Sequence, residues 1–180
     1  MRIEINEHTF IQDIEEEDAN EIFAVIDRDR QYLRTFLGWV DFNQSVEDIK
    51  EFIEIGKRME RLNSGGNYLI RYNGKFAGIV SLNQINWTNH YTSIGYWLAS
   101  HAQGKGIMTE CVRQLIRYTF DDLGLNRAEI RCSTANHRSE AIAIRLGFKW
   151  EGRIREAEWL YDHYVDHQVY GLLKRDWVLT

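Results

Sequence analysis

The stretch of sequence that decides the fold lies between residues 94 and 109 and reads IGYWLASHAQGKGIMT. Its first five residues are mostly apolar or aromatic and are typical of a strand, whereas the apolar spacing from Ile107 onward is typical of a helix. Between them lies the glycine-rich connection Gln103-Gly104-Lys105-Gly106. A glycine loop that leads from a strand into a helix directs several backbone N–H groups toward one point, which suits a phosphate group.

Two well-known phosphate motifs do not fit this loop. A Walker A loop needs glycine five residues before Gly104 and Ser or Thr after the lysine, and these positions hold Ala99 and Gly106. A dinucleotide-binding fingerprint based on Gly104 and Gly106 needs Gly or Ala at Thr109. A plain strand-to-helix connection remains the alternative interpretation of the loop taken alone.

The rest of the chain predicts a mixed sheet covered by helices. Ser45-Val46-Glu47-Asp48 resembles a capping box with Asp in place of Glu, so a helix is expected after Ser45. Apolar spacing predicts further helices over residues 17–30, 107–124 and 137–146. Alternating patterns and the turn Asn73-Gly74 predict strands at residues 68–72, 75–82, 93–99, 127–132, 148–160 and 164–173. This order indicates an α/β (α+β) fold with a mixed, mostly antiparallel central sheet and helices on both faces.

Length and composition limit the classes of protein. A chain of 180 residues is expected to form a single domain over 1–180. The net charge of −5 argues against a broad nucleic-acid surface. No stretch approaches the roughly 20 apolar residues of a membrane helix, and the first residues lack a secretory pattern, so a cytoplasmic location and no membrane association are expected. Cys111 and Cys132 lack metal-like spacing and are interpreted as buried, reduced thiols.

Three motifs in order resemble one enzyme superfamily. Gln103 to Met108 is similar to the pyrophosphate loop Gln/Arg-x-x-Gly-x-Gly/Ala of the GNAT acetyltransferases, with Met108 where Gly or Ala is usual. Residues 94–98 look like the family strand that diverges to admit the pantetheine arm. Residues 136–139, Asn-His-Arg-Ser, followed by Leu-Gly-Phe at 146–148 and Glu-Gly at 151–152, are similar to the second family motif. The chain is therefore identified as a member of the GNAT superfamily, most similar to RimL-type acetyltransferases.

This resemblance implies a reaction and its partners. It implies acetyl-CoA as co-substrate, without a metal, and direct attack in a ternary complex by the N-terminal α-amine of a ribosomal protein. It also suggests a homodimer. The residues that it assigns to acetyl-CoA are Tyr96, Trp97, Leu98, Gln103, Gly104, Lys105, Gly106, Ile107, Met108, Thr109 and Asn136.

The same resemblance supplies candidate catalytic groups. An amine attacks a thioester only when it is neutral, so a base is needed, and the departing thiolate needs a proton. The backbone N–H of Leu98 is expected to bind the thioester oxygen. Many relatives carry a tyrosine acid at the position of Ala143, whereas RimL-type members imply Ser139 as the acid and Glu158 as the base. Glu156, two residues away on the same expected strand, is the fallback base.

Several alternatives stay open from the sequence alone. Ser139 is equally explained as a first-turn helix residue, and Glu158 as an exposed strand carboxylate. His163 and His167 stand four apart, roughly 13 Å on a strand, which is too far for a shared metal. Among the aromatics Phe36, Trp39, Trp87 and Trp97, an acceptor-pocket role is open for Trp39 and Trp97. Two rival functions remain. The first is an acetyltransferase that acts on a small-molecule amine, and the second is an acetyl-CoA-binding module without catalytic activity.

Overall fold

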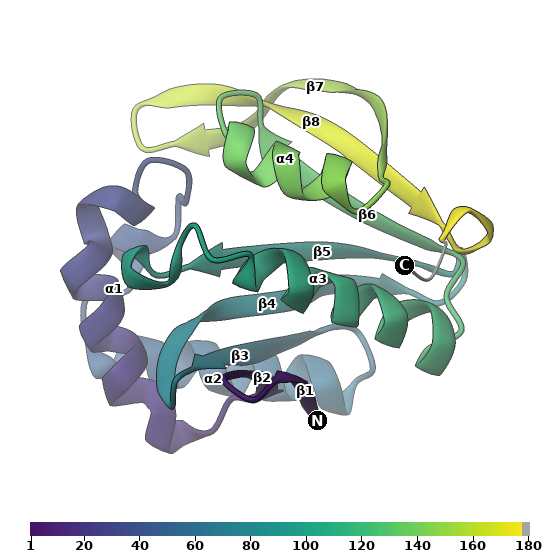
Figure 1. Cartoon of the computed structure of the whole chain (residues 1–180). Helices are drawn as coiled ribbons and strands as arrows, with labels where there is room; N and C mark the ends of the chain where they lie inside the picture. The colour runs from purple at the N-terminus through teal and green to yellow at the C-terminus, as the bar shows by residue number, and fades with distance from the viewer. Residues whose placement is uncertain (178–180) are drawn as a thin grey trace.

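A single eight-stranded sheet forms the centre of the molecule, whose computed structural model describes residues 1–177 (Figure 1). The strand order is β1-β2-β3-β4-β5-β6-β8-β7, and only β5 and β6 pair in parallel. The sheet is therefore mixed and mostly antiparallel, as predicted. Its strands are β1 (Arg2–Asn6), β2 (Thr9–Asp13), β3 (Gly66–Tyr72), β4 (Lys75–Asn86), β5 (Tyr91–Leu98), β6 (Arg127–Ser133), β7 (Lys149–Leu160) and β8 (His163–Leu173).

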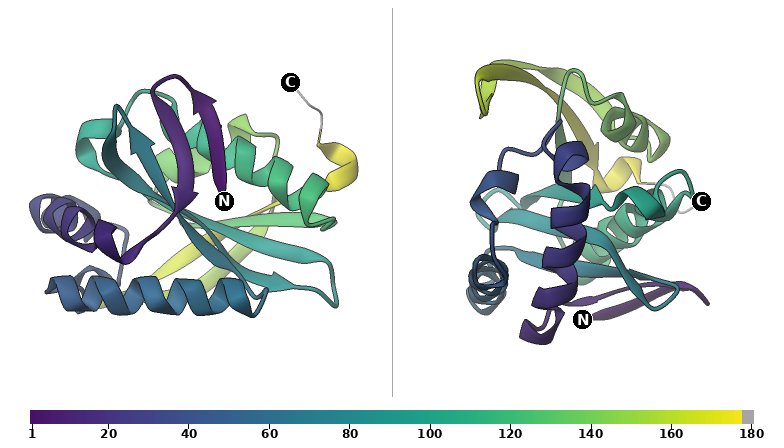
Figure 2. Two further views of the ribbon diagram at one scale, coloured as in Figure 1. Left: turned by 90° about the horizontal axis from the view of Figure 1, so that it is seen from below. Right: turned by 90° about the vertical axis from the view of Figure 1, so that its left-hand side faces the viewer.

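Helices cover both faces of this sheet, which confirms the expected layering (Figure 2). One core lies between the sheet and the pair α1 (Ala19–Leu33) and α2 (Val46–Arg61). A second core on the opposite face contains α3 (Ile107–Arg117) and α4 (His137–Arg145). Residues 76–82 of β4 are all buried because successive side chains enter alternate cores. Within residues 1–177, none of the helices has the length and apolar character needed to cross a membrane.

The predicted helix after Ser45 has the capping box that the sequence indicates. The Ser45 hydroxyl accepts a hydrogen bond from the Asp48 N–H at 3.2 Å. The Asp48 carboxylate accepts one from the Ser45 N–H at 2.8 Å. The shorter Asp side chain thus performs the role usually given to Glu, and two backbone donors are satisfied at the start of α2.

Two features differ from the sequence prediction. The N-terminal hairpin of β1 and β2 was not predicted, because each strand has only five residues and β1 has an exposed edge. The predicted helix does end near Gly124, but it is not one regular α-helix: α3 ends at Arg117, and a π-helical turn at Tyr118–Asp122 continues it. Phe120 stays fully buried in this turn, so the apolar pattern is satisfied without regular α-helical geometry.

A buried carboxylate ties α1 to the chain just before the glycine loop. Asp29 is 6% exposed and accepts hydrogen bonds from the Ser100 N–H at 2.7 Å and the Ser100 hydroxyl at 2.9 Å. The Arg28 guanidinium also donates to it at 2.9 Å. Burial raises the pKa of Asp29, but the hydrogen bonds from Arg28 and Ser100 outweigh burial and lower the pKa overall. These hydrogen bonds fix the position of Ser100, which lies just before the glycine loop that starts at Gln103.

Asp29→Asn is expected to destabilise the protein by about 1–3 kcal/mol at neutral pH, because Ser100 and Arg28 lose a charged acceptor. Since the folded-state pKa lies below the unfolded value, the contribution of the carboxylate is complete above the unfolded pKa of about 4 and is lost as pH falls through the folded value. Thermal unfolding should show a Tm difference between variant and wild type at pH 7 that shrinks in acid. Equal Tm values at pH 7 would contradict this role.

Candidate active site

The glycine loop has a backbone conformation that requires glycine. Gly104 and Gly106 have φ of +72° and +74°, in the left-handed region that side chains disfavour. A Cβ placed on either residue would meet no atom within 4 Å, so the space in front of the loop is open. Gly106 precedes α3, whose first-turn N–H groups have no intrahelical acceptor. The loop and the helix start together form a concentrated set of donors that fits a pyrophosphate.

The sheet opens beside this loop. β5 pairs with β6 only from Tyr91 to Ile94, whereas β4 stays paired with β5 as far as Leu98. Figure 1 shows β5 and β6 together at one end of the sheet and apart at the other. The Ala99 N–H donates to the Ala77 carbonyl at 2.8 Å, on the β4 side. Because strand N–H groups alternate in direction, the Leu98 N–H points away from β4, into the gap left by β6.

A cleft of about 1320 Å³ runs through this opening and along the loop. It brings together all eleven residues predicted to bind acetyl-CoA, and Ser139 as well. Glu158 is not among its lining residues. Residues that the sequence interpretation did not single out also line it, mainly Tyr32, Thr35, Leu37, Arg138, Ile142 and Arg145. The structure therefore groups the predicted residues of the loop, of β5 and of α4 around one space.

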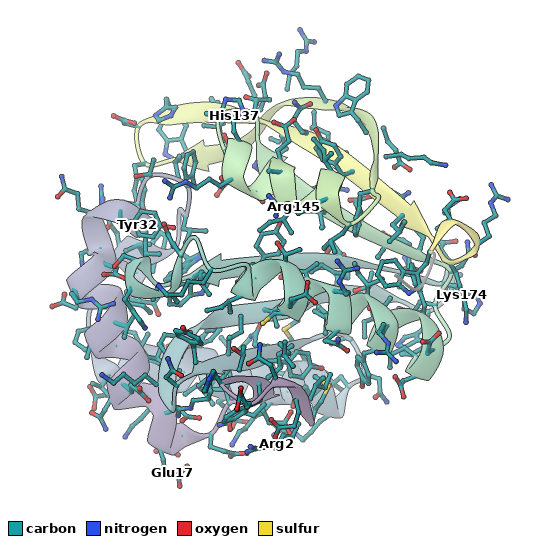
Figure 3. The ribbon with its side chains drawn as sticks, in the orientation of Figure 1. Arg2, Glu17, Tyr32, His137, Arg145 and Lys174 are labelled. Atoms are coloured by element: carbon teal, nitrogen blue, oxygen red, sulfur yellow. The ribbon has the colours of Figure 1, made fainter. Side chains whose placement is uncertain are left out.

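Cations from two sides face the cleft. Arg138 and Arg145 come from α4, and Lys105 comes from the loop. The Arg138 guanidinium donates to the Gln103 side chain at 2.7 Å, and Arg145 donates to the Thr109 hydroxyl at 2.8 Å. Figure 3 shows Arg145 between α4 and α3. Positive charge beside free backbone donors favours a polyanionic ligand in this cleft.

Ser139 is held by two neighbours at the other wall of the cleft. The Asn136 side chain caps α4 by accepting a hydrogen bond from the Ser139 N–H at 3.2 Å. The Ser139 hydroxyl donates to the Tyr96 oxygen at 3.0 Å, and the Tyr96 hydroxyl donates to the Ser139 carbonyl at 3.1 Å. Burial raises the pKa of Tyr96 well above its usual value, so the phenol stays protonated. These contacts fix the hydroxyl of Ser139 at the wall of the cleft.

Both cysteines are buried and unpaired, as expected. Burial raises the pKa of Cys132 to about 11, and burial raises the pKa of Cys111 further still. A thiol with such a pKa is almost wholly protonated near neutral pH. Neither side chain is therefore suited to act as a nucleophile.

Glu158 lies on the β7–β8 hairpin, beside the chain segment that follows α1. Its Oε2 is 3.0 Å from His167 Nε2. A Cβ on Gly38 would lie 3.2 Å from its Oε1, so this carboxylate packs directly against that segment. The neighbouring residue Leu37 lines the cleft and accepts a hydrogen bond from the Tyr161 hydroxyl at 2.5 Å. The carboxylate is thus adjacent to the cleft wall without being part of it.

The environment of Glu156 differs from the one that strand alternation predicts. A bulge interrupts β7 between Ile154, which pairs with His167, and Glu158, which pairs with Val165. Glu156 lies in this bulge with φ of +48°, is exposed, and donates its N–H to Asp166 at 2.7 Å. The expectation that Glu156 points the same way as Glu158 by strand period is wrong, because the bulge breaks that period.

The aromatic candidates divide into core and surface residues. Trp97 packs against Trp39 and Phe76, with ring centroids 5.6 Å and 5.5 Å away, in the core beneath α1 and α2. Trp97 and Phe36 line the cleft. Trp87 is 42% exposed and donates to the Asn63 carbonyl at 2.5 Å, away from the cleft. Of the four aromatic candidates, only Trp97 both lines the cleft and packs against this core, and Trp39 does not line the cleft.

The two histidines of the β8 strand have separate partners. His163 Nδ1 is 2.6 Å from Asp162, and His167 pairs with Glu158. Over residues 1–177, no group of three or more His, Cys, Asp or Glu side chains is arranged to hold a metal ion.

Comparison with known proteins agrees with this geometry. Residues 9–149 match the acetyltransferase (GNAT) domain family. The chain is 33% identical over 174 residues to YdaF of Bacillus subtilis (strain 168), covering 96% of this chain and 95% of that protein. It is 29% identical over 169 residues to the ribosomal-protein-serine acetyltransferase of Escherichia coli (strain K12), covering 94% of each.

Solved structures extend the comparison to ligand complexes. RimL, the ribosomal L7/L12 α-N-protein acetyltransferase in complex with coenzyme A, has a TM-score of 0.93 at 25% identity, over 96% of this chain and 98% of that one. The microcin C7 self-immunity acetyltransferase MccE, in complex with acetyl-CoA and AMP, has a TM-score of 0.91 at 31% identity, over 95% of each chain.

The diverging strands, the glycine loop and the helix start thus define an enzyme that binds a CoA thioester. The chain belongs to the GNAT family and is an acetyl-CoA-dependent N-acetyltransferase.

Gly106→Glu is expected to weaken CoA binding by orders of magnitude, because a charged side chain would enter the space in front of the loop and repel phosphate. Gly124→Glu is the matched control: Gly124 has φ of +66° and open space around it, but does not line the cleft. Titration calorimetry with CoA should show the loss only for position 106. Equal CoA affinities for the two folded variants would remove the loop from the site.

Proposed function

We propose that this enzyme acetylates the N-terminal α-amine of a ribosomal protein by direct attack in a ternary complex. The observation that carries the proposal is the position of Glu158, a half-buried carboxylate beside the segment at Leu37 and Gly38 that borders the cleft. Similarity to the ribosomal-protein-serine acetyltransferase and to RimL supports the choice of acceptor.

The reaction needs three actions from this chain. Residues 103–109 hold the pyrophosphate through backbone donors, and Asn136 contacts the pantetheine or thioester end. The Leu98 N–H, directed into the gap between β5 and β6, donates to the thioester oxygen as negative charge develops there. Glu158 accepts the proton of the attacking amine, and Ser139 supplies a proton to the departing thiolate.

Glu158→Gln is expected to lower kcat by about 10²–10⁴-fold with nearly unchanged CoA affinity, because an amide cannot accept the amine proton. Part of the loss should return at high pH, where more of the amine is already neutral. Glu156→Gln, two residues away in the bulge, is the control and should keep wild-type turnover. Wild-type turnover of Glu158→Gln at pH 7 would place the base elsewhere.

Ser139→Ala is expected to lower kcat by about 10²–10⁴-fold if its hydroxyl protonates the thiolate, directly or through a water. Tyr96→Phe should lower kcat less, because it removes only the partner that orients the hydroxyl. Steady-state kinetics at saturating acetyl-CoA measures both effects. Full activity of Ser139→Ala would leave Ser139 as an ordinary residue in the first turn of α4.

A peptide α-amine is expected to be preferred over a lysine side chain. An α-amino group titrates near 8 and lysine near 10.4, so at pH 7 the α-amine is neutral far more often and one carboxylate base suffices. Ribosomal proteins and short peptides with free N-termini, serine first among them, should be incubated with acetyl-CoA and mapped by tandem mass spectrometry. Acetylation confined to lysine ε-amines or to free polyamines would overturn this choice of acceptor.

A further inference from the structure

The proposed base has a histidine partner that the proposed mechanism leaves without a role. His167 Nε2 lies 3.0 Å from Glu158 Oε2, which is hydrogen-bonding distance. The two side chains are 19% and 35% exposed, so the pair is half-buried at the edge of the sheet. At this depth a hydrogen bond to a carboxylate is less exposed to competition from water than one on an open surface.

The register of the hairpin brings the two residues together. Glu158 pairs with Val165, and Val165 and His167 lie on the same face of β8 because they are two residues apart. Glu158 and His167 are therefore diagonal neighbours on one face of the hairpin. The bulge between Ile154 and Glu158 shifts the β7 register here, so the pair depends on that irregularity.

The second carboxylate oxygen faces the cleft wall. A Cβ at Gly38 would lie 3.2 Å from Glu158 Oε1, so this oxygen lies against the segment after α1. Tyr161, at the turn of the hairpin, holds that segment by donating to the Leu37 carbonyl, and Arg34 stacks 4.0 Å from the centre of the Tyr161 ring. One oxygen of Glu158 is thus bound by His167 while the other is directed toward the segment that lines the cleft.

Charged groups on β6, at the hairpin turn and after α1 have partners other than Glu158 and His167. On β6, Ser133 is opposite His167, and the nearest charged residues on that face, Arg131 and Glu129, pair with each other. At the hairpin turn His163 pairs with Asp162, and after α1 Arg34 pairs with Asp41. Glu158 is therefore the carboxylate with which His167 interacts.

We propose that His167 is the positioning residue for the base. Its Nε2–H donates to Glu158 Oε2, selects one rotamer of that side chain, and leaves Oε1 to accept the proton from the amine. The amine loses one proton to Oε1 as the new N–C bond forms and the C–S bond of the thioester breaks; Ser139 supplies the proton of the departing thiolate, and His167 keeps its Nε2 proton throughout. This inference rests on the proposed function, because it assigns His167 a role only through Glu158.

Three substitutions at position 167 separate positioning from packing. The amide nitrogen of Gln is as many bonds from the backbone as Nε2 of His, whereas that of Asn corresponds to Nδ1 and falls short of Glu158. His167→Gln should keep kcat within a few fold, whereas His167→Asn and His167→Ala should each lower kcat by about 10-fold or more, the effect of losing one hydrogen bond to a charged group. KM for acetyl-CoA should stay constant in all three. His163→Ala, an exposed histidine on the same strand, is the control and should behave as wild type.

A double substitution distinguishes failure of this inference from failure of the proposed function. Because His167 acts through Glu158, adding His167→Ala to Glu158→Gln should cost no further activity. Full turnover of Glu158→Gln would overturn the proposed base, and with it the role of its partner. An inactive Glu158→Gln together with unchanged kcat in a folded His167→Ala, or equal losses for the Gln and Asn variants, would overturn the positioning role alone.

Discussion

The site depends on the early end of pairing between β5 and β6. These neighbouring strands are hydrogen-bonded for four residue pairs, up to Ile94 and Ile130, and then separate. Unpaired backbone groups on a strand cost free energy when they are buried without a partner. The second half of β5 therefore offers a row of donors and acceptors that an extended ligand can satisfy. The Leu98 N–H points into this gap, and the cleft runs through it.

The same gap connects the two faces of the sheet. Ser139 and Tyr96 lie on the face covered by α3 and α4, where Tyr96 packs against the core of that side. Glu158 lies beside Gly38. Gly38 belongs to the segment between α1 and α2, the two helices that cover the other face. A proton donor and a proton acceptor on opposite faces of a closed sheet could not serve one reaction. The roles proposed for Ser139 and Glu158 therefore depend on the separation of β5 from β6.

Much of the fold was predictable because it depends on local pattern. The Asn73-Gly74 turn, the capping box at Ser45 and the strand–loop–helix from residue 94 are each set by neighbouring residues, and the structure has all three. The cleft residues were predicted through a motif that keeps them in sequence order. By contrast, the five-residue strands β1 and β2 have too few alternations to predict pairing.

The acceptor side was less predictable because it is built from contacts distant in sequence. The bulge that separates Glu156 from Glu158 has no marker as plain as a glycine turn. The contact between Glu158 and Gly38 joins residues 120 positions apart, and the pairing of Arg138 with Gln103 crosses the cleft. The sequence does not indicate the contact of His167 with Glu158, since the two residues come together only through the register of the hairpin.

The role of the open half of β5 can be measured at a single backbone amide. Amide hydrogen exchange followed by NMR, with and without acetyl-CoA, reports whether the Leu98 N–H becomes hydrogen-bonded to the ligand. The Ala99 N–H, already bonded to Ala77, is the internal reference and should exchange slowly in both states. The predicted result is strong protection of Leu98 and of residues 103–109 on binding. Saturating acetyl-CoA that leaves the exchange of Leu98 unchanged would contradict the placement of the thioester in the gap between β5 and β6.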